Sequence, residues 1–303
     1  MADNAEIFPR FRDEAGRARY LAAYDDALAA WPIPYTVIEA ATRFGPAHVV
    51  ASGPADGPPL VLLPSLAAGA VVWRLNVAGL ARVFRTYAVD VIGQPGKTAA
   101  VRRLRDRADY TGWLSDVMGS LNLARASIVG CSFGGFLAAN QALAAPDHVR
   151  GVVLISPVGV FASQRLKLFY LMRVKATAAR LARRLSARRS GPSHAGTRAG
   201  AVIAAPRDLS WARLMAVTMA ERPKLSVISP PVFGAAQLAA IRAPTLLLIG
   251  EREQLYAPEV MLALARRRMP GLQTEIVPDA DHIAAMAQPD DVNDRITRFL
   301  GTA

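Results

Sequence analysis

Short apolar runs, each bounded by turn residues, are the feature of this 303-residue chain that most constrains its fold. They read PLVLLPS, TYAVDV, ASIVGC, VRGVVLIS, TLLLIGE and TEIVPDA, and as strands they would be apolar on both faces. Stretches with helical character lie between them, for example ADYTGWLSDVMGSLNL and FGGFLAANQALAA. Strands that are apolar on both faces lie inside a parallel sheet that helices cover. The pattern therefore predicts an α/β fold with a mostly parallel sheet.

The part of the chain that precedes this alternation predicts two additional elements. Two earlier runs, VIEAA and HVVAS, are joined through TRFGPA and favour an antiparallel edge to the sheet. Residues 1–34 are expected to form an N-terminal helical extension, with one amphipathic helix from roughly Asp13 to Ala30 that the sequence WPIP ends.

The alternation breaks once, between Val158 and Ala235. There the chain becomes helical, basic and locally rich in glycine and serine, before strands and helices resume at APTLLLIG. We expect residues 158–235 to form an inserted helical cap. The α/β core is then made of residues 35–157 and 236–303.

The net charge of +12 is concentrated in this predicted cap. Ten basic residues and no acidic one lie between Arg165 and Arg198, which leaves +2 for the rest of the chain. The ten are Arg165, Lys167, Arg173, Lys175, Arg180, Arg183, Arg184, Arg188, Arg189 and Arg198. No nucleic-acid-binding motif accompanies them, so no nucleic-acid partner is expected. Three alternatives stay open: a docking surface for an acidic carrier protein, a solvated basic face, or a segment with weak attraction to anionic lipid.

The sequence predicts a cytoplasmic location. The first 20 residues mix both signs of charge and lack the apolar stretch of a secretory signal, and no run approaches the length of a transmembrane helix. The single cysteine, Cys131, excludes an internal disulfide and a cysteine-rich metal site.

Ser132 is the candidate nucleophile. It follows the predicted strand ASIVGC and precedes a predicted helix, with Gly130 and Gly134 two positions away on either side. Strand, tight turn and helix around GxSxG are typical of a nucleophile elbow. Side chains at the two glycines would collide with the neighbouring strand and helix. The Ser132 Oγ is then exposed at a helix N-terminus, where backbone N–H groups stabilise negative charge.

A nucleophilic serine needs a histidine as general base, and the chain has four histidines. His282 lies just past the last predicted strand and before the C-terminal helix, which is the position expected for the base. His48 belongs to an early strand, His148 to a surface turn and His194 to the loop rich in arginine, glycine and serine. Structural roles are expected for these three.

The acid that orients the histidine should follow the strand TLLLIGE, where two carboxylates compete. Glu253 stands three residues beyond Gly250 and is free to turn toward the histidine, whereas Glu251 is at the strand tip. We favour Glu253. The other position for an acid, after VRGVVLIS, offers Ser156 and Pro157 and no carboxylate.

An oxyanion hole requires two backbone donors. The N–H of Phe133, directly after the nucleophile, is the first candidate. The second should come from the loop after PLVLL, where Leu66 is the favoured donor and Ala67 the alternative. Cys131 precedes the nucleophile and is expected to pack inward beneath it.

With these residues the chain resembles the α/β-hydrolase superfamily, and more closely its bacterial carboxylesterases of the naproxen-ester-hydrolysing type. The resemblance extends over nearly the whole length, through WPIPY, TRFGPAHVVASG, PPLVLLP, YAVDVIG, DYTGWLSDV, VGCSFGG, LLLIGEREQLYAPE and HIAAMAQPDDVNDRITRFL. It implies an eight-stranded, mostly parallel core with a helical cap over the active site. It also implies a glutamate as the acid, three residues after the glycine that ends the strand.

The chain departs from the family pattern in the oxyanion loop, where Pro64 and Ser65 stand in place of the usual His-Gly. It departs again after YAVDVIG, where Gln94 replaces the usual aspartate, and before the histidine, where DADH replaces a glycine-rich turn. The sequence assigns no mechanism to Gln94.

The function that these residues favour is hydrolysis of a small-molecule carboxylic ester through an acyl-enzyme on Ser132, with no cofactor and no metal. One alternative is a biosynthetic thioesterase or cyclase that acts on a carrier-bound or polyketide-like chain, motivated by the basic cap. Another is a protein of this fold that binds a ligand or promotes a rearrangement without hydrolysis, motivated by the altered oxyanion loop.

Overall fold

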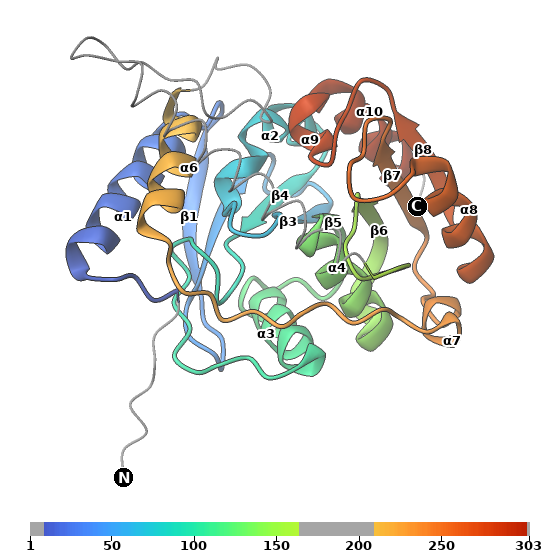
Figure 1. Ribbon diagram of the computed structural model, residues 1–303, viewed down its shortest axis with the longest axis horizontal. Helices are drawn as coiled ribbons and strands as arrows, with labels where there is room; N and C mark the ends of the chain where they lie inside the picture. Colours follow the sequence, from blue (N-terminus) through green and yellow to red (C-terminus); the bar gives the residue numbers. More distant parts are fainter. Residues whose placement is uncertain (1–8, 164–208, 302–303) are drawn as a thin grey trace, which may run out of the picture.

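The computed structural model describes residues 9–163 and 209–301 of the chain. In this part, eight strands form one sheet in the order β1-β2-β4-β3-β5-β6-β7-β8 (Figure 1). The strands are β1 (Tyr35–Ala40), β2 (Ala47–Ser52), β3 (Pro59–Leu63), β4 (Arg85–Val89), β5 (Ala126–Cys131), β6 (Val149–Ile155), β7 (Thr245–Gly250) and β8 (Gln273–Val277). β2 pairs antiparallel with both β1 and β4, and all the other pairs are parallel. The predicted antiparallel edge and mostly parallel sheet are therefore confirmed.

Helices cover both faces of the sheet. The α-helices of the described residues are α1 (Glu14–Ala29), α2 (Val77–Leu80), α3 (Arg107–Ser120), α4 (Phe133–Ala144), α6 (Leu209–Glu221), α7 (Ala235–Ala239), α8 (Pro258–Arg268), α9 (Ala284–Ala287) and α10 (Pro289–Leu300). Two 3₁₀ helices, η1 (Ala70–Leu75) and η2 (Pro146–His148), complete the set.

The strands distribute their side chains alternately between two hydrophobic clusters. In β3, Val61 and Leu63 pack in the cluster that holds the inner sides of α3, α4 and α8, whereas Leu60 and Leu62 pack in the cluster with α1, η1, α2 and α10. Successive strand residues point to opposite faces, so a strand buried on both sides must be apolar throughout. The outer strands depart furthest from this rule, because β8 is partly exposed along its length and β1 is mostly exposed.

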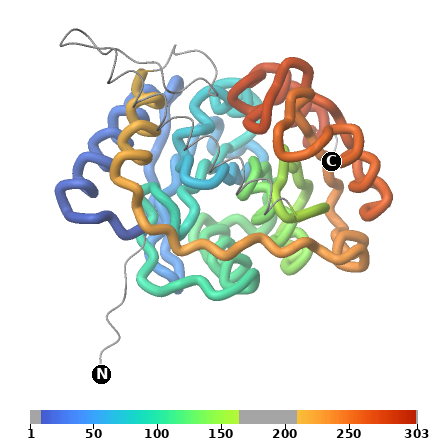
Figure 2. Tube along the Cα trace, viewed as in Figure 1, coloured from blue at the N-terminus to red at the C-terminus, as the bar shows by residue number. Residues whose placement is uncertain are grey.

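The predicted N-terminal helix is present as α1, with Asp13 as its N-cap. The Asp13 side chain accepts a hydrogen bond from the Gly16 N–H at 2.6 Å, which satisfies one of the free donors of the first turn. α1 lies side by side with α6, although the two are far apart in the chain (Figure 2). Arg19 Nε bonds Glu221 Oε1 at 2.7 Å between them, and Arg213 of α6 pairs with Asp26 of α1.

The described end of the predicted cap is thus anchored on the N-terminal extension and then runs back to the core. After α6, residues 222–234 form no helix and no strand of the sheet; Ser226 N–H donates to Gly93 O at 2.8 Å and Phe233 N–H to Val160 O at 3.3 Å. The ten clustered basic residues between Arg165 and Arg198 lie outside the described residues. Within residues 9–163 and 209–301, no helix is both long and apolar enough to span a lipid bilayer.

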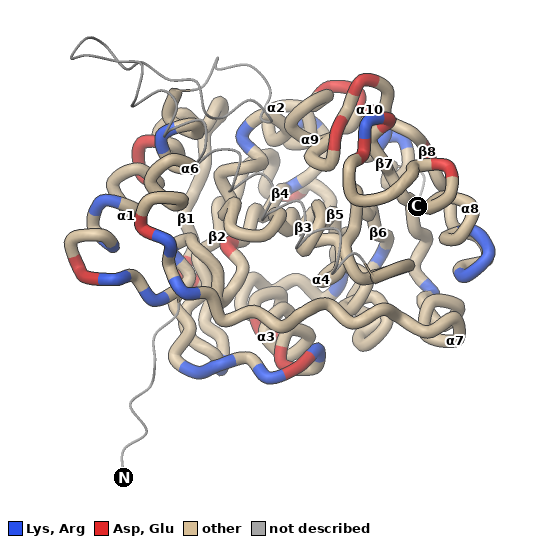
Figure 3. Tube along the Cα trace, in the orientation of Figure 1, with Lys and Arg blue, Asp and Glu red and all other residues tan. Residues whose placement is uncertain are grey.

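Basic residues also cluster along the described chain, in the loop before α3 and at the end of α8 (Figure 3). The first group contains Arg102, Arg103 and Arg105, and the last turn of α8 is formed by three consecutive arginines, 266–268. Arg102 lies 4.1 Å from the Phe44 ring centre and 3.7 Å from an Asp109 oxygen. The described part of the chain therefore contributes positive surface of its own.

Candidate active site

Ser132 sits on the sharp turn between β5 and α4. Its backbone has φ 53° and ψ −109°, a conformation that residues with a β-carbon rarely adopt and that costs about 1–3 kcal/mol. The Ser132 N–H donates to Ile155 O at 2.8 Å, which holds the turn against the end of β6. The strain is local to the candidate nucleophile, as the elbow motif predicts.

The two glycines of the motif allow close packing around this turn. A β-carbon on Gly130 would lie 2.2 Å from the Gly134 carbonyl oxygen, and one on Gly134 would lie 2.2 Å from the Leu63 carbonyl oxygen. Neither position accepts a side chain without displacing backbone. The predicted steric role of Gly130 and Gly134 is confirmed, and Gly134 brings the elbow against the start of the loop that follows β3.

The structure brings Ser132, His282 and Glu253 together, although they are far apart in the sequence. His282 Nε2 lies 2.9 Å from Ser132 Oγ, and its Nδ1 lies 2.8 Å from Glu253 Oε2. An ionised carboxylate only accepts hydrogen bonds, so Nδ1 carries the proton and donates to Glu253. Nε2 is then left as the acceptor for the Ser132 hydroxyl, which is the tautomer that a general base requires.

Glu253 is held in a fully buried position. Its second oxygen, Oε1, accepts hydrogen bonds from the backbone N–H groups of Gln254 at 2.7 Å and Leu255 at 2.9 Å. Burial raises the pKa of Glu253, but the hydrogen bond and charge of His282 and the Leu255 N–H outweigh burial, and the pKa lies below its ordinary value. The carboxylate is therefore ionised at neutral pH and can stabilise an imidazolium.

Glu251, the competing carboxylate, does not join this group. It is exposed, and its Oε2 accepts a hydrogen bond from the Asp279 N–H at 2.9 Å. Although Glu251 and Glu253 are only two residues apart in the turn after β7, their side chains have different partners. Glu251 caps the loop after β8, while Glu253 reaches the imidazole.

Gly250, the last residue of β7, explains how the acid and the histidine meet. A β-carbon there would lie 2.3 Å from the Asp281 carbonyl oxygen and 2.5 Å from the Ala280 carbonyl oxygen. The loop that carries His282 therefore crosses directly over the end of β7, and Arg252 N–H donates to Ala280 O at 2.8 Å. In the sequence, a glycine at the end of a buried strand is the signal that could have indicated this crossing.

The two candidate oxyanion donors lie on segments that pack together at the elbow, where Gly134 contacts the backbone of Leu63 and Pro64. Phe133 N–H is at the first position of α4, and Leu66 N–H is in the loop of residues 64–69, which we call the β3 loop. Within the described residues, neither N–H has an acceptor. The alternative donor, Ala67 N–H, is already engaged, because it donates to Gln94 Oε1 at 2.8 Å.

The other described histidines and the cysteine make no contact with the Ser132 hydroxyl that would make them a base or a nucleophile. His48 is buried beside Asp90, His148 is exposed in η2, and His194 lies outside the described residues. Cys131 is buried, and burial together with the negative charges of Glu253 and Asp281 raises the pKa of its thiol to about 12. A thiol with this pKa is inert at neutral pH. In the described part of the chain no three His, Cys, Asp or Glu side chains form a cluster suited to a metal ion.

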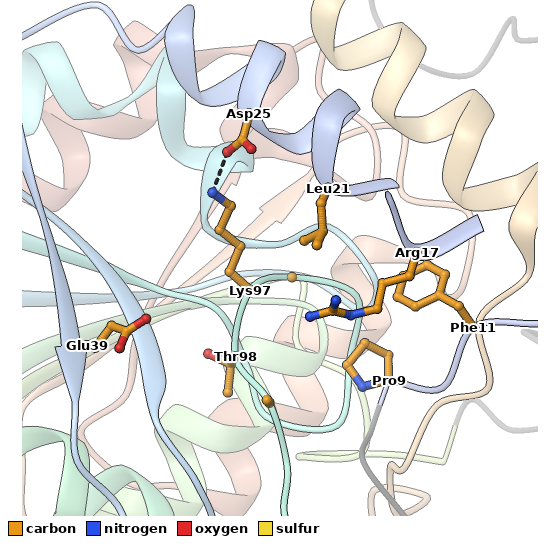
Figure 4. A pocket seen from close by; sticks show the side chains of 10 residues that line it. Pro9, Phe11, Arg17, Leu21, Asp25, Glu39, Lys97 and Thr98 are labelled. Atoms are coloured by element: carbon orange, nitrogen blue, oxygen red, sulfur yellow. Dashed lines mark hydrogen bonds and ion pairs between the residues drawn. The ribbon is translucent and has the colours of Figure 1, made fainter. Parts of the chain in front are cut away.

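A surface hollow of about 300 Å³ lies where the start of α1 meets the loop after β4 (Figure 4). Lys97 reaches across it to bond Asp25, and its Nζ lies 5.6 Å from the Tyr24 ring centre. The hollow is lined by Pro9, Phe11, Arg17, Leu21, Asp25, Glu39, Gly96, Lys97, Thr98 and Ala99. Because none of the candidate site residues lines it, this hollow is distinct from the site around Ser132.

Comparison with known proteins agrees with this geometry. Residues 60–295 match the model of the Alpha/beta hydrolase family. The chain is 34% identical over 287 residues to carboxylesterase YbfK of Bacillus subtilis, and the match covers 93% of each chain. It is 31% identical over 303 residues to the uncharacterized carboxylesterase nap of the same organism, and this match covers 99% of this chain and 97% of the other.

Solved structures show the same likeness in three dimensions. The crystal structure of carboxylesterase CesB (YbfK) from Bacillus subtilis superposes with a TM-score of 0.80 at 33% identity, over 96% of this chain and 100% of that one. Naproxen esterase from Bacillus subtilis superposes with a TM-score of 0.79 at 29% identity, over 94% and 98%. The chain therefore belongs to the alpha/beta hydrolase family, and it is similar over nearly its whole length to bacterial carboxylesterases.

Proposed function

We propose that this protein is a serine carboxylesterase that cleaves small carboxylic esters through an acyl-enzyme. The observation that carries the proposal is the continuous path of hydrogen bonds from Ser132 Oγ to His282 Nε2 at 2.9 Å and from His282 Nδ1 to Glu253 Oε2 at 2.8 Å. The carboxylesterases named above, similar to this chain over nearly its full length, support ester hydrolysis as the activity.

Acylation begins when Ser132 Oγ attacks the ester carbonyl carbon and His282 Nε2 takes the hydroxyl proton. The carbonyl π electrons move to oxygen, and the resulting oxyanion accepts hydrogen bonds from Phe133 N–H and Leu66 N–H. The ionised Glu253 stabilises the imidazolium. The tetrahedral intermediate collapses as its carbon–oxygen bond to the alcohol breaks, and His282 returns the proton to the departing alkoxide.

Deacylation repeats these steps with water. His282 removes a proton from a water molecule, the hydroxide oxygen bonds to the acyl carbon, and the same two N–H groups hold the oxyanion. The bond to Ser132 Oγ then breaks, and Oγ recovers the proton from His282. The products are a carboxylic acid and the free enzyme. Every proton in this cycle is carried by a side chain of the chain itself or by water.

We further propose that residues 35–157 and 236–303 form the catalytic core and that residues 158–235 are a cap that selects the substrate. The support for this division is that β7 follows β6 in the sheet, so the described residues between these two strands contribute no strand to it. α6, the described helix of the cap, is held on α1 by the pairs Arg19–Glu221 and Arg213–Asp26.

The test is hydrolysis of p-nitrophenyl esters with a short and a medium acyl chain by wild-type protein, Ser132→Ala and the matched control Ser127→Ala. Ser127 is a buried serine at the opposite end of β5. We expect Ser132→Ala to lose about 10⁴-fold or more in kcat, because it removes the group that forms the covalent bond, whereas Ser127→Ala should stay within about threefold of wild type.

A Ser132→Ala variant that retains a tenth of the wild-type rate would overturn the proposal. A thioester of the same acyl chain, assayed beside the oxygen ester, separates the two hydrolytic alternatives. A much larger kcat/KM on the thioester would make the protein a thioesterase with the same nucleophile.

A further inference from the structure

The Gln94 side chain connects the loop after β4 to the β3 loop. It is 2% exposed, and its Oε1 lies 2.8 Å from the Ala67 N–H. Because a backbone N–H can only donate, the atom that faces it must be the amide oxygen, and this assigns the orientation of the Gln94 amide. No mechanism follows for Gln94 from the sequence alone.

The β3 loop needs this support because its backbone is strained at the bonded residue. Ala67 has φ 61°, a left-handed conformation that alanine adopts rarely. Inside the loop, Ala68 N–H donates to Ser65 O at 3.2 Å. Directly after it, Ala70 N–H donates to Asp90 Oδ1 at 2.6 Å. Two side chains that follow β4 therefore hold this segment, Gln94 in the middle and Asp90 at the end.

The residue held by Gln94 is adjacent to the candidate oxyanion donor. The hydrogen bond to Ala67 N–H fixes the peptide plane that joins Leu66 to Ala67, and this restricts the direction of the preceding Leu66 N–H. Within the described residues Leu66 N–H has no acceptor, whereas Ala67 N–H is occupied. One donor of the loop is thus engaged, and the one beside it stays free for a ligand.

Only one end of the Gln94 amide is hydrogen-bonded in the described structure. The Gln94 Nε2 is buried, and within the described part of the chain it has no hydrogen-bond partner. Burying an amide N–H₂ without an acceptor is unfavourable for folding. An apolar side chain of the same length would avoid that penalty but would leave the Ala67 N–H without its acceptor, so the bond to Ala67 is what the Gln94 amide contributes here.

We propose that Gln94 is a positioning residue for the oxyanion hole: by accepting the Ala67 N–H, it holds the β3 loop in the conformation that directs the Leu66 N–H at the reacting carbonyl oxygen. This inference rests on the proposed function. Oxyanion donors are effective because they are already oriented when charge develops, and a loop that relaxes loses that advantage.

The kinetic test compares Gln94→Met with the matched control Gln141→Met. Methionine has the length of glutamine but no amide acceptor, and Gln141 is a buried glutamine of α4 whose Nε2 donates to Ser115 Oγ at 2.9 Å. We expect Gln94→Met to lower kcat about tenfold to a hundredfold, less than the loss of a whole donor group would, with KM changed less than threefold. The pH profile of kcat should keep its shape, because the Ser132–His282–Glu253 contacts are untouched. Gln141→Met should keep the wild-type kcat.

Amide hydrogen exchange supplies a readout that does not depend on turnover. The Ala67 amide should exchange slowly in wild type and at least about tenfold faster in Gln94→Met. Gln94→Glu keeps an acceptor at the same place, so it should restore slow exchange at Ala67. Turnover is not the readout for this variant, because the charge of a carboxylate would act on the oxyanion directly.

Each result decides the inference. Faster exchange at Ala67 together with a lower kcat supports it. Unchanged exchange overturns it, and so does faster exchange with an unchanged kcat, since the loop would then be held without any effect on the reaction. The Ser132→Ala assay separates failure of this inference from failure of the proposed function. If wild-type protein hydrolyses no ester, the proposed function fails, and the positioning role in that reaction fails with it. Amide exchange still reports whether Gln94 holds Ala67.

Discussion

Two histidine–carboxylate pairs lie in the described part of the chain, and they differ in what surrounds the histidine. His282 lies 2.8 Å from Glu253 and is 23% exposed, with its second nitrogen 2.9 Å from the Ser132 hydroxyl. The His48 side chain is 5% exposed, and its Nδ1 lies 3.2 Å from Asp90 Oδ2. Within the described residues, neither ring nitrogen of His48 makes a hydrogen bond of good geometry.

The carboxylates of the two pairs, Asp90 and Glu253, differ in their hydrogen-bond partners. Asp90 accepts from the Tyr24 hydroxyl at 3.0 Å and from the N–H groups of Ala70 and Lys97 at 2.6 Å each, so its oxygens hold three separate segments together. One Glu253 oxygen is committed to backbone N–H groups, and the other is reserved for His282. A histidine beside a carboxylate can act as a base for catalysis only when its far nitrogen meets a nucleophile. In the described residues His282 meets this condition and His48 does not.

The largest difference between the pairs should appear when each histidine is replaced by glutamine. We expect His282→Gln to lower kcat about 10⁴-fold or more, because no base then accepts the Ser132 proton. His48→Gln should keep kcat within about threefold and lower the free energy of unfolding by about 1–3 kcal/mol, because a buried polar contact with Asp90 is lost. Steady-state kinetics and urea unfolding of both variants check this. A loss of activity in His48→Gln without loss of stability would contradict the structural role of His48.

A smaller effect should separate the two carboxylates that follow β7. Glu253→Gln keeps the shape of the side chain but no longer fixes the imidazole tautomer, and we expect kcat to fall about 10³-fold to 10⁴-fold. Glu251→Gln is the matched control, since Glu251 bonds only the exposed Asp279 N–H in the described structure, and it should stay within about twofold. Equal losses in both variants would mean that the acid is not Glu253 alone.

The smallest effect concerns stability in acid. The folded-state pKa of Glu253 is lowered, with burial opposing and His282 and backbone N–H groups prevailing. Ionised Glu253 therefore contributes stability that is fully present above the ordinary glutamate pKa, near 4.5, and is lost as the pH falls through the lowered folded value. Urea unfolding of wild type and Glu253→Gln between pH 3 and pH 7 checks this. The wild-type curve should fall toward the variant below about pH 4.5; a constant gap between them would contradict the linkage.

Much of the fold was predictable because burial acts on every residue of a strand. The continuous apolar runs at β3, β5, β6 and β7 indicated a covered parallel sheet, and Gly130, Ser132 and Gly134 indicated a strained turn between β5 and α4. Such signals are local, since they depend on backbone geometry and side-chain size within a few residues.

The contacts between loops were less predictable. Nothing near Gln94 in the chain indicates that its amide meets Ala67, because the two residues come together only after β3 and β4 have paired side by side in the sheet. His48 likewise meets Asp90 because β2 pairs with β4. These contacts depend on strand order, which hydrophobic periodicity does not specify.

The amino-acid sequence by itself determined the class of fold and the strained serine turn, and it predicted an order of nucleophile, acid and base, because each depends on residue type and local spacing. Only the tertiary structure decided that Glu253 rather than Glu251 reaches His282, that Ala67 N–H is taken while Leu66 N–H is free, and that His48 is a structural partner of Asp90. The physical reason is that a hydrogen bond forms or fails over less than an ångström, and loop positions at that scale are set by the packing of segments far apart in the chain.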